Sequence, residues 1–149
     1  MSVSTEKSCG AFTQRFPALS NKLTSKAQAV WKGKSQDAVA LWDTGATVTC
    51  ISTALAKELR LVATGGRTLR TPAGSKIVNT YLIDIVLPNE IRMHDVVVCD
   101  STIGQQGFDI LIGMDIILHG DLSVSNFNGQ TMFSFRIPSK EATDYSCNT

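Results

Sequence analysis

One short stretch decides the fold: Ala40-Leu41-Trp42-Asp43-Thr44-Gly45-Ala46-Thr47. Its apolar beginning, extended by Val39, is typical of a strand that is buried on both faces. The strand then runs into a carboxylate, a hydroxyl and a glycine, and Gly45 lets the backbone turn sharply. Because a tight turn after a buried strand holds its side chains rigidly, we expect Asp43 at the floor of a cleft. Backbone amides would point at its carboxylate, and the Thr44 hydroxyl would fix the turn.

The tripeptide Asp43-Thr44-Gly45 is a weak signal alone, because its three residue types also dominate ordinary turns. Two features of the surrounding sequence strengthen it. The β-branched run Val48-Thr49-Cys50-Ile51 follows, and a second apolar segment, Asp109-Ile110-Leu111-Ile112-Gly113-Met114-Asp115, comes later and is closed by a glycine. We expect the two apolar segments to form strands that cross and brace one another.

These residues resemble the retropepsin-like aspartic proteases. Asp43-Thr44-Gly45-Ala46 matches the catalytic loop of that family, and Leu111-Ile112-Gly113 matches its motif of two apolar residues and a glycine. Retroviral members carry an acidic residue after the first motif and an arginine after the second, and the two form an ion pair. This chain has Thr47 and Met114 there, so both partners are absent together and no charge is orphaned. The sequence is therefore more similar to bacterial, retrotransposon and DNA-damage-inducible-type members.

The resemblance implies an all-β fold, a closed retropepsin-like β-barrel with one or two short helices. It spans residues 25–138, with an N-terminal extension at 1–24 and a polar C-terminal tail at 139–149. A chain of 149 residues makes one domain of this kind, about half a two-lobed enzyme.

Peptide hydrolysis by aspartates needs two carboxylates, one to take a proton from water and one to give a proton to the substrate carbonyl. The chain contains one Asp-Thr-Gly. We therefore expect a two-fold homodimer that brings the Asp43 side chains of both copies together. The predicted activity is an aspartic endopeptidase that cleaves extended peptide or protein substrates without metal or cofactor. Asp43, Thr44 and Gly45 are the predicted catalytic residues, and Thr44 would bond across the two-fold axis.

Substrate contacts are expected from the loop, from a hairpin and from the second motif. The hairpin comprises residues 67–71 and 76–87, and its tip is made of small residues that suit a close approach to a peptide backbone. In the family this hairpin would be the flap over the substrate, whereas an ordinary hairpin is the alternative. The predicted substrate-binding residues are Ala46, Thr47, Pro72, Ala73, Gly74, Ser75, Leu111 and Ile112.

Other patterns predict the supporting elements. Residues 25–31 and 37–42 are expected to form a hairpin, Ser52 to cap a helix over 53–59, and residues 91–99 to form a strand. By the resemblance, Asp115 would start a second short helix, and Asp is a good N-cap. Asn128-Gly129 is the strongest short hairpin signal and predicts a terminal hairpin over 121–137. Its apolar face carries Phe133, Phe135 and Ile137, and by the resemblance its strands pair between subunits. Asp84, His94 and His119 are interpreted as structural.

Composition excludes several functions. The net charge is +1 and no basic block occurs, which argues against nucleic acid as a partner. No apolar leader or membrane-length segment occurs either, so a cytoplasmic location away from membranes is expected. Cys9, Cys50, Cys99 and Cys147 lack paired metal-ligand spacing, which argues against zinc. Two alternatives stay open, a non-catalytic peptide-binding dimerisation module of the same fold and a structural β-domain of a larger assembly.

Overall fold

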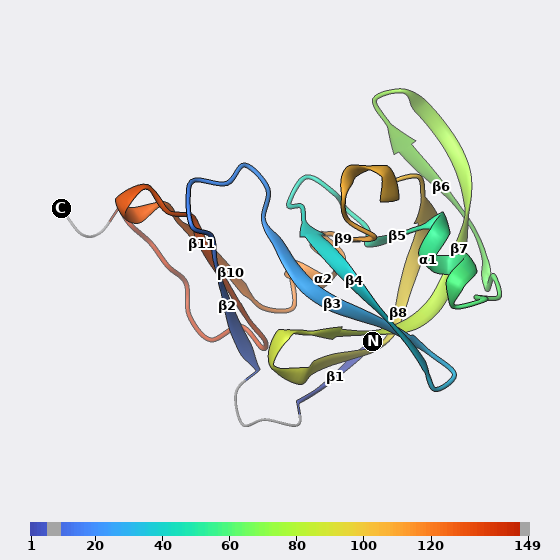
Figure 1. Cartoon of the computed structure of the whole chain (residues 1–149), viewed down its shortest axis with the longest axis horizontal. Coiled ribbons are helices and arrows are strands. Elements are labelled where there is room, and N and C mark those ends of the chain that lie inside the picture. The colour runs from blue at the N-terminus through green and yellow to red at the C-terminus, as the bar shows by residue number, and fades with distance from the viewer. Residues whose placement is uncertain (6–9, 147–149) are drawn as a thin grey trace.

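The fold is almost entirely β in this computed structural model, which describes residues 1–5 and 10–146 (Figure 1). The strands are β1 (Ser2–Thr5), β2 (Ala11–Arg15), β3 (Thr24–Trp31), β4 (Lys34–Trp42), β5 (Cys50–Ser52), β6 (Gly65–Thr71), β7 (Gly74–Leu87), β8 (Ile91–Ser101), β9 (Ile110–Ile112), β10 (Asp121–Ser125) and β11 (Met132–Arg136). The helices are short: α1 (Thr53–Glu58), α2 (Met114–Ile117) and the 3₁₀ turns η1 (Pro88–Glu90), η2 (Gly104–Gln106) and η3 (Phe127–Gly129). In the described part of the chain, no helix has the length and apolar character needed to cross a bilayer.

Six strands close into a barrel. Their order is β8-β5-β9-β4-β3-β7, and β7 pairs again with β8, so the ring has no open edge. β1 and β6 extend it by pairing with β8 and β7. Large aliphatic side chains such as Ile51, Ile85 and Ile110 are fully buried inside it. The closed all-β barrel expected from the sequence is therefore confirmed.

A second sheet, in the order β10-β11-β2, lies beside the barrel (Figure 1). The terminal hairpin is present, and its turn has positive φ at Asn128 (54°) and Gly129 (73°), as an Asn-Gly turn requires. The apolar face of this hairpin is already covered within the chain, because Phe133 and Phe135 are fully buried and pack on Phe12 and Trp42. Pairing of these strands between subunits stays a prediction, for which β2 and β10 each have an unpaired edge among the described residues.

Several local expectations are met, and one is not. β3 and β4 form the expected hairpin, and the Ser52 hydroxyl caps α1 by accepting a hydrogen bond of 3.0 Å from the Leu55 amide. β4 is not buried on both faces, however, because Val39 is 40% exposed. The N-terminal extension, residues 1–24, supplies β1 to the barrel and β2 to the second sheet.

Asp84 on β7 forms hydrogen bonds to β8, and His94 extends this network to β1. Its carboxylate accepts hydrogen bonds from Arg92 (2.9 Å), from His94 (3.0 Å) and from the Asp95 amide (3.0 Å), while the other ring nitrogen of His94 lies 2.7 Å from the Ser4 hydroxyl. Burial raises the pKa of Asp84, but these donors outweigh it, so the pKa lies below its ordinary value. Asp84 and His94 are therefore structural, as the sequence analysis interpreted them.

Asp84→Asn should lower the free energy of unfolding by about 1–2 kcal/mol at pH 7. A depressed native pKa stabilises the fold above the ordinary value of 3.8, and this contribution is lost as the pH falls through the native pKa. Urea unfolding of both proteins at pH 7 and pH 3 should therefore show a difference that shrinks in acid. A difference that is equal at both pH values would mean that the Asp84 charge does not stabilise this corner.

Candidate active site

The loop between β4 and β5 carries Asp43 and holds its carboxylate in place. The Gly45 amide donates a hydrogen bond of 2.8 Å to Asp43 Oδ1, and the Ala46 amide donates to the Asp43 carbonyl at 3.2 Å. A Cβ on Gly45 would lie 3.1 Å from the same carboxylate oxygen, so the small residue suits this close approach. The expected bond from the turn to the carboxylate is thus present.

Thr44 does not fix the turn in the way expected. Its side chain is exposed, and its hydroxyl makes no hydrogen bond with the residues that the structure describes. The turn is instead held by backbone amides. The Thr44 hydroxyl is consequently available for a partner outside the chain.

The second apolar segment braces this loop from below. β9 runs parallel to β4, with Leu41 beside Leu111 and Trp42 beside Ile112. The Asp43 amide donates to the Ile112 carbonyl at 3.0 Å, and the Met114 amide donates to the Ala46 carbonyl at 2.8 Å. The two predicted strands therefore meet and brace one another, and the brace ends directly beneath Asp43.

Gly113 occupies the tightest position of this brace. A Cβ at this residue would lie 2.7 Å from the carbonyl carbon and oxygen of Val48, which is far inside van der Waals contact. The apolar-apolar-glycine motif therefore lets β9 press against the backbone of the Asp43 loop.

Asp115 supports the loop through Thr49. Both atoms of its carboxylate are used, since Oδ1 accepts from the Thr49 hydroxyl (2.7 Å) and Oδ2 from the Thr49 amide (2.8 Å). The same hydroxyl accepts from the Gly113 amide at 3.1 Å, and Thr49 is fully buried. Asp115 stands in the first turn of α2, where Oδ1 also accepts from the Ile116 amide at 3.0 Å. The expectation that it is the N-cap of this helix is wrong, because Gly113 holds that position. Sequence reasoning missed the supporting role of Thr49. The feature that could have indicated it is a hydroxyl group inside a buried, β-branched run.

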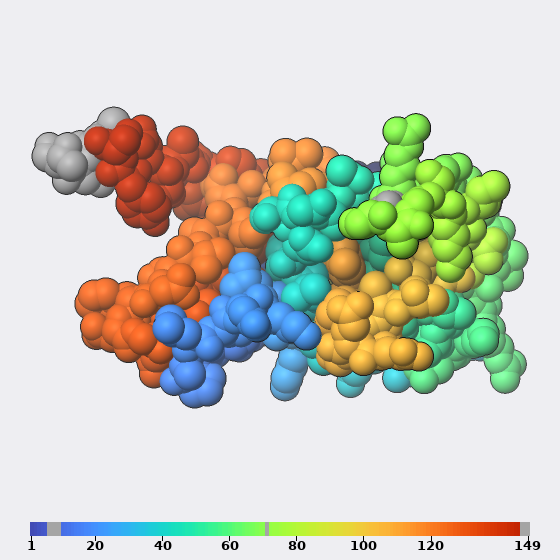
Figure 2. Space-filling view, turned by 90° about the horizontal axis from the view of Figure 1, so that it is seen from above, coloured from blue at the N-terminus to red at the C-terminus, as the bar shows by residue number. Residues whose placement is uncertain are grey.

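This loop and two other segments surround a hollow. Figure 2 shows the β6–β7 hairpin (light green), the loop after β4 (cyan) and the segment between β8 and β9 (gold) around it. An apolar cluster separate from the main core joins the same three segments beneath the surface. Its members are Cys50, Val78, Cys99, Ile103 and Phe108, with Leu41, Val48, Leu69 and Leu111 packed against them.

The predicted substrate-binding residues differ in exposure. Thr47 and the hairpin tip, Pro72 to Ser75, are exposed, while Ala46 and Leu111 are half-buried. Ile112 is fully buried, so its side chain supports the core beneath the loop and does not reach the hollow. The hairpin itself is present, whereas its role as a flap stays a prediction.

The two described cysteines are core residues. Burial raises the pKa of the Cys50 thiol to about 12, and the neighbouring Cys99, its register partner on β8, adds to the rise. Burial also raises the pKa of Cys99. Both thiols are therefore protonated at neutral pH, while Cys9 and Cys147 lie outside the described residues.

The other acids near the loop are occupied by the fold. Asp109 accepts from the Ser52 hydroxyl at 2.7 Å, and Asp100 accepts from the Thr53 hydroxyl at 2.6 Å. None of the hydrogen bonds between described residues joins Asp43 to a second carboxylate. Within one chain, therefore, Asp43 is the one carboxylate that this loop presents, and no second carboxylate of the described residues is hydrogen-bonded to it.

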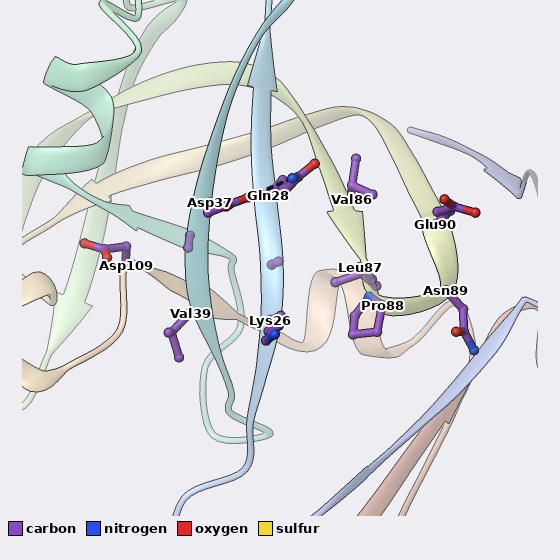
Figure 3. A pocket seen from close by; sticks show the side chains of 12 residues that line it. Lys26, Gln28, Asp37, Val39, Val86, Leu87, Pro88, Asn89, Glu90 and Asp109 are labelled. Carbon is purple, nitrogen blue, oxygen red and sulfur yellow. Dashed lines mark hydrogen bonds between the residues drawn. The ribbon is translucent and has the colours of Figure 1, made fainter.

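A separate hollow of about 670 Å³ lies on the flank of the barrel. Figure 3 shows that its lining comes from β3, β4, the end of β7, η1 and Asp109 just before β9, with Gln28 and Asp37 hydrogen-bonded to one another at 2.7 Å. Asp43 does not line it. We therefore assign the candidate active site to the hollow above the Asp43 loop.

Residues 27–116 match the family model of aspartyl proteases, and the chain belongs to that family. Its fold is similar to that of a retropepsin-like aspartic protease from Rickettsia conorii, with a TM-score of 0.56 and 12% identity over 90% of this chain and 99% of that one. The protease of simian foamy virus (mac) is another similar structure, with a TM-score of 0.46 and 21% identity over 64% of this chain and 92% of that one. No curated protein matches the chain. The likeness to the Rickettsia conorii protein supports the retropepsin-like fold, and the family match places the chain among the aspartyl proteases.

Proposed function

We propose that the chain is an aspartic endopeptidase whose active site is completed by a second copy of itself. The observation that carries this proposal is the Asp43 loop, in which one carboxylate is held by the Gly45 amide and braced from below by Ile112 and Gly113. A rigid, half-exposed carboxylate suits proton transfer to and from a bound water. The second carboxylate would be Asp43 of the other copy, because the other acids near the loop are occupied.

The mechanism needs no covalent intermediate. The two Asp43 carboxylates share one proton and hold a water between them. The ionised carboxylate takes a proton from this water while the water oxygen attacks the peptide carbonyl carbon. The protonated carboxyl donates its proton to the developing oxyanion. Collapse of the tetrahedral intermediate breaks the C–N bond: the leaving amine takes the proton from one carboxyl, and a hydroxyl of the intermediate returns its proton to the other, so the dyad again holds one proton. The exposed Thr44 hydroxyls would bond across the axis and hold the pair together.

The substrate would lie extended beneath the β6–β7 hairpin. The hairpin tip at Pro72–Ser75 consists of small, exposed residues, which leave room for a peptide backbone to approach. An extended peptide satisfies its backbone hydrogen bonds against loop and strand edges, as in other strand-addition complexes. Leu111, Ala46 and Thr47 are the proposed contacts on the floor.

Incubation with a mixed peptide library, followed by mass spectrometry, tests this function. We expect internal cleavage, and the activity per chain should fall on dilution as dimers dissociate. Sedimentation at the same concentrations reports the oligomeric state. Binding of peptides without cleavage would favour the non-catalytic module, and constant activity from a pure monomer would contradict the shared dyad.

A further inference from the structure

The β6–β7 hairpin carries a one-sided charge. Between Gly65 and Val78 it contains Arg67, Arg70 and Lys76 and no acidic residue. None of these three cations forms an ion pair within the described part of the chain. The hairpin therefore presents positive charge that the fold itself does not neutralise.

The strand register divides the three cations between two faces. Arg67 pairs with Val78 and Leu69 pairs with Lys76, so these four side chains share one face. Val78 is 8% exposed and, with Leu69, belongs to the apolar cluster beneath the hollow, so this face is the inner one. Arg70 alternates to the outer face, as does Ile77, which is 79% exposed. Two cations therefore line the inner face and one lies outside.

The position of Arg67 agrees with this division. Burial raises the pKa values of Cys50 and Cys99, and the positive charge of Arg67 opposes the rise at both thiols. Both thiols lie in the cluster beneath the hollow, so the charge of Arg67, whose side chain is exposed, acts on the inner side of the hairpin.

The other two walls of the hollow offer these cations little compensation. The segment between β8 and β9 has one charged residue, Asp109, and Asp100 lies at the end of β8; these two carboxylates accept hydrogen bonds from the Ser52 and Thr53 hydroxyls. The loop from Asp43 to Thr49 has Asp43 alone. A peptide held under the hairpin would thus meet positive charge from above and one catalytic charge from below. Complementary charge on the peptide is what such a site favours.

We propose that the substrates are acidic peptides, whose Asp or Glu side chains beside the scissile bond bind Arg67 and Lys76 under the hairpin. This inference rests on the proposed function. An extended peptide turns alternate side chains toward the same face. Arg67 and Lys76 are diagonal neighbours across the strand pair, so they would meet acidic side chains two positions apart on the peptide.

The first test compares matched peptides cleaved from the library, each made with Asp or Glu and again with Asn or Gln at the same positions. We expect kcat/KM to be roughly five-fold higher for each acid that contacts a cation, and the advantage to fall as salt rises from low to physiological concentration. Equal kcat/KM for acidic and amide peptides would overturn the proposal, while cleavage itself would leave the proposed function standing.

The second test uses charge reversal with a matched control. Arg67→Glu and Lys76→Glu should each remove or invert the preference for acidic peptides, whereas Arg70→Glu, which makes the same change on the outer face of the same hairpin, should retain it. Amide peptides report whether each variant still turns over. Binding of an acidic peptide to the Asp43→Asn protein, followed by fluorescence anisotropy, gives a readout that does not need cleavage. An equal effect of all three reversals would indicate general attraction to the net charge and contradict the assignment to the inner face.

Discussion

Replacing Asp43 by asparagine is expected to lower the rate of peptide hydrolysis by roughly 10²–10⁴-fold, the usual contribution of a general acid–base group. Asparagine has the same shape and its side-chain oxygen still accepts the bond from the Gly45 amide. It does not ionise, and therefore it cannot take a proton from water. The fold and its stability should stay close to those of the original chain.

The matched control is Asp37→Asn, the same change at an exposed acid of β4, the strand that leads into the Asp43 loop. It should leave kcat/KM unchanged, because Asp37 bonds to Gln28 on the flank of the barrel. Measuring kcat/KM together with urea unfolding separates lost chemistry from lost fold. Full activity in the Asp43→Asn protein would place the chemistry elsewhere in the molecule.

Gly113→Ala should damage both the fold and the active site. The backbone at Gly113 has a φ of −94°, which alanine adopts freely, so any cost comes from space. The added Cβ would meet the Val48 backbone at 2.7 Å, and backbone cannot move aside as the end of a flexible side chain can. Overpacking of this kind costs about 1–3 kcal/mol and lowers Tm by roughly 3–10 °C in a chain of this size.

We expect kcat/KM of this variant to fall by more than its loss of stability alone would explain, because the displaced Val48 lies in the loop that carries Asp43. Gly66→Ala is the control, since a Cβ there would meet its nearest neighbour, the Val78 carbonyl oxygen, at an ordinary 3.6 Å. Thermal unfolding and kcat/KM of both variants give the comparison. A Gly113→Ala protein with unchanged Tm and activity would show that the close contact does not position the loop.

The sequence predicts the loop and its brace well because both depend on local chemistry. A glycine beside a carboxylate and a glycine after two apolar residues are needed for close backbone contacts, and such requirements are visible in the residues themselves. The Asn128-Gly129 turn is predictable for the same reason. The closed barrel was predictable too, because the motifs at Asp43 and Gly113 carry the resemblance that implies it.

Long-range pairing is what the sequence could not supply. β2 pairs with β11 across most of the chain, and nothing in the pattern of residues 11–15 indicates that partner. Asp115 is a similar case, because an acid near a helix start is explained by capping until the structure places Thr49 beside it. Val39 shows the reverse error, since an apolar residue in a strand is not buried when no element covers that face.

Mixing active and inactive chains tests the shared active site most directly. Original chain at fixed concentration would be incubated with increasing Asp43→Asn chain, long enough for subunits to exchange, and assayed with saturating peptide. If each site needs Asp43 from two copies, the inactive chain captures active chains in mixed dimers, and activity should fall toward zero as it is added in excess. Added Asp37→Asn chain should raise the activity instead. Activity that stays constant in the presence of excess Asp43→Asn chain would contradict a dyad formed by two chains.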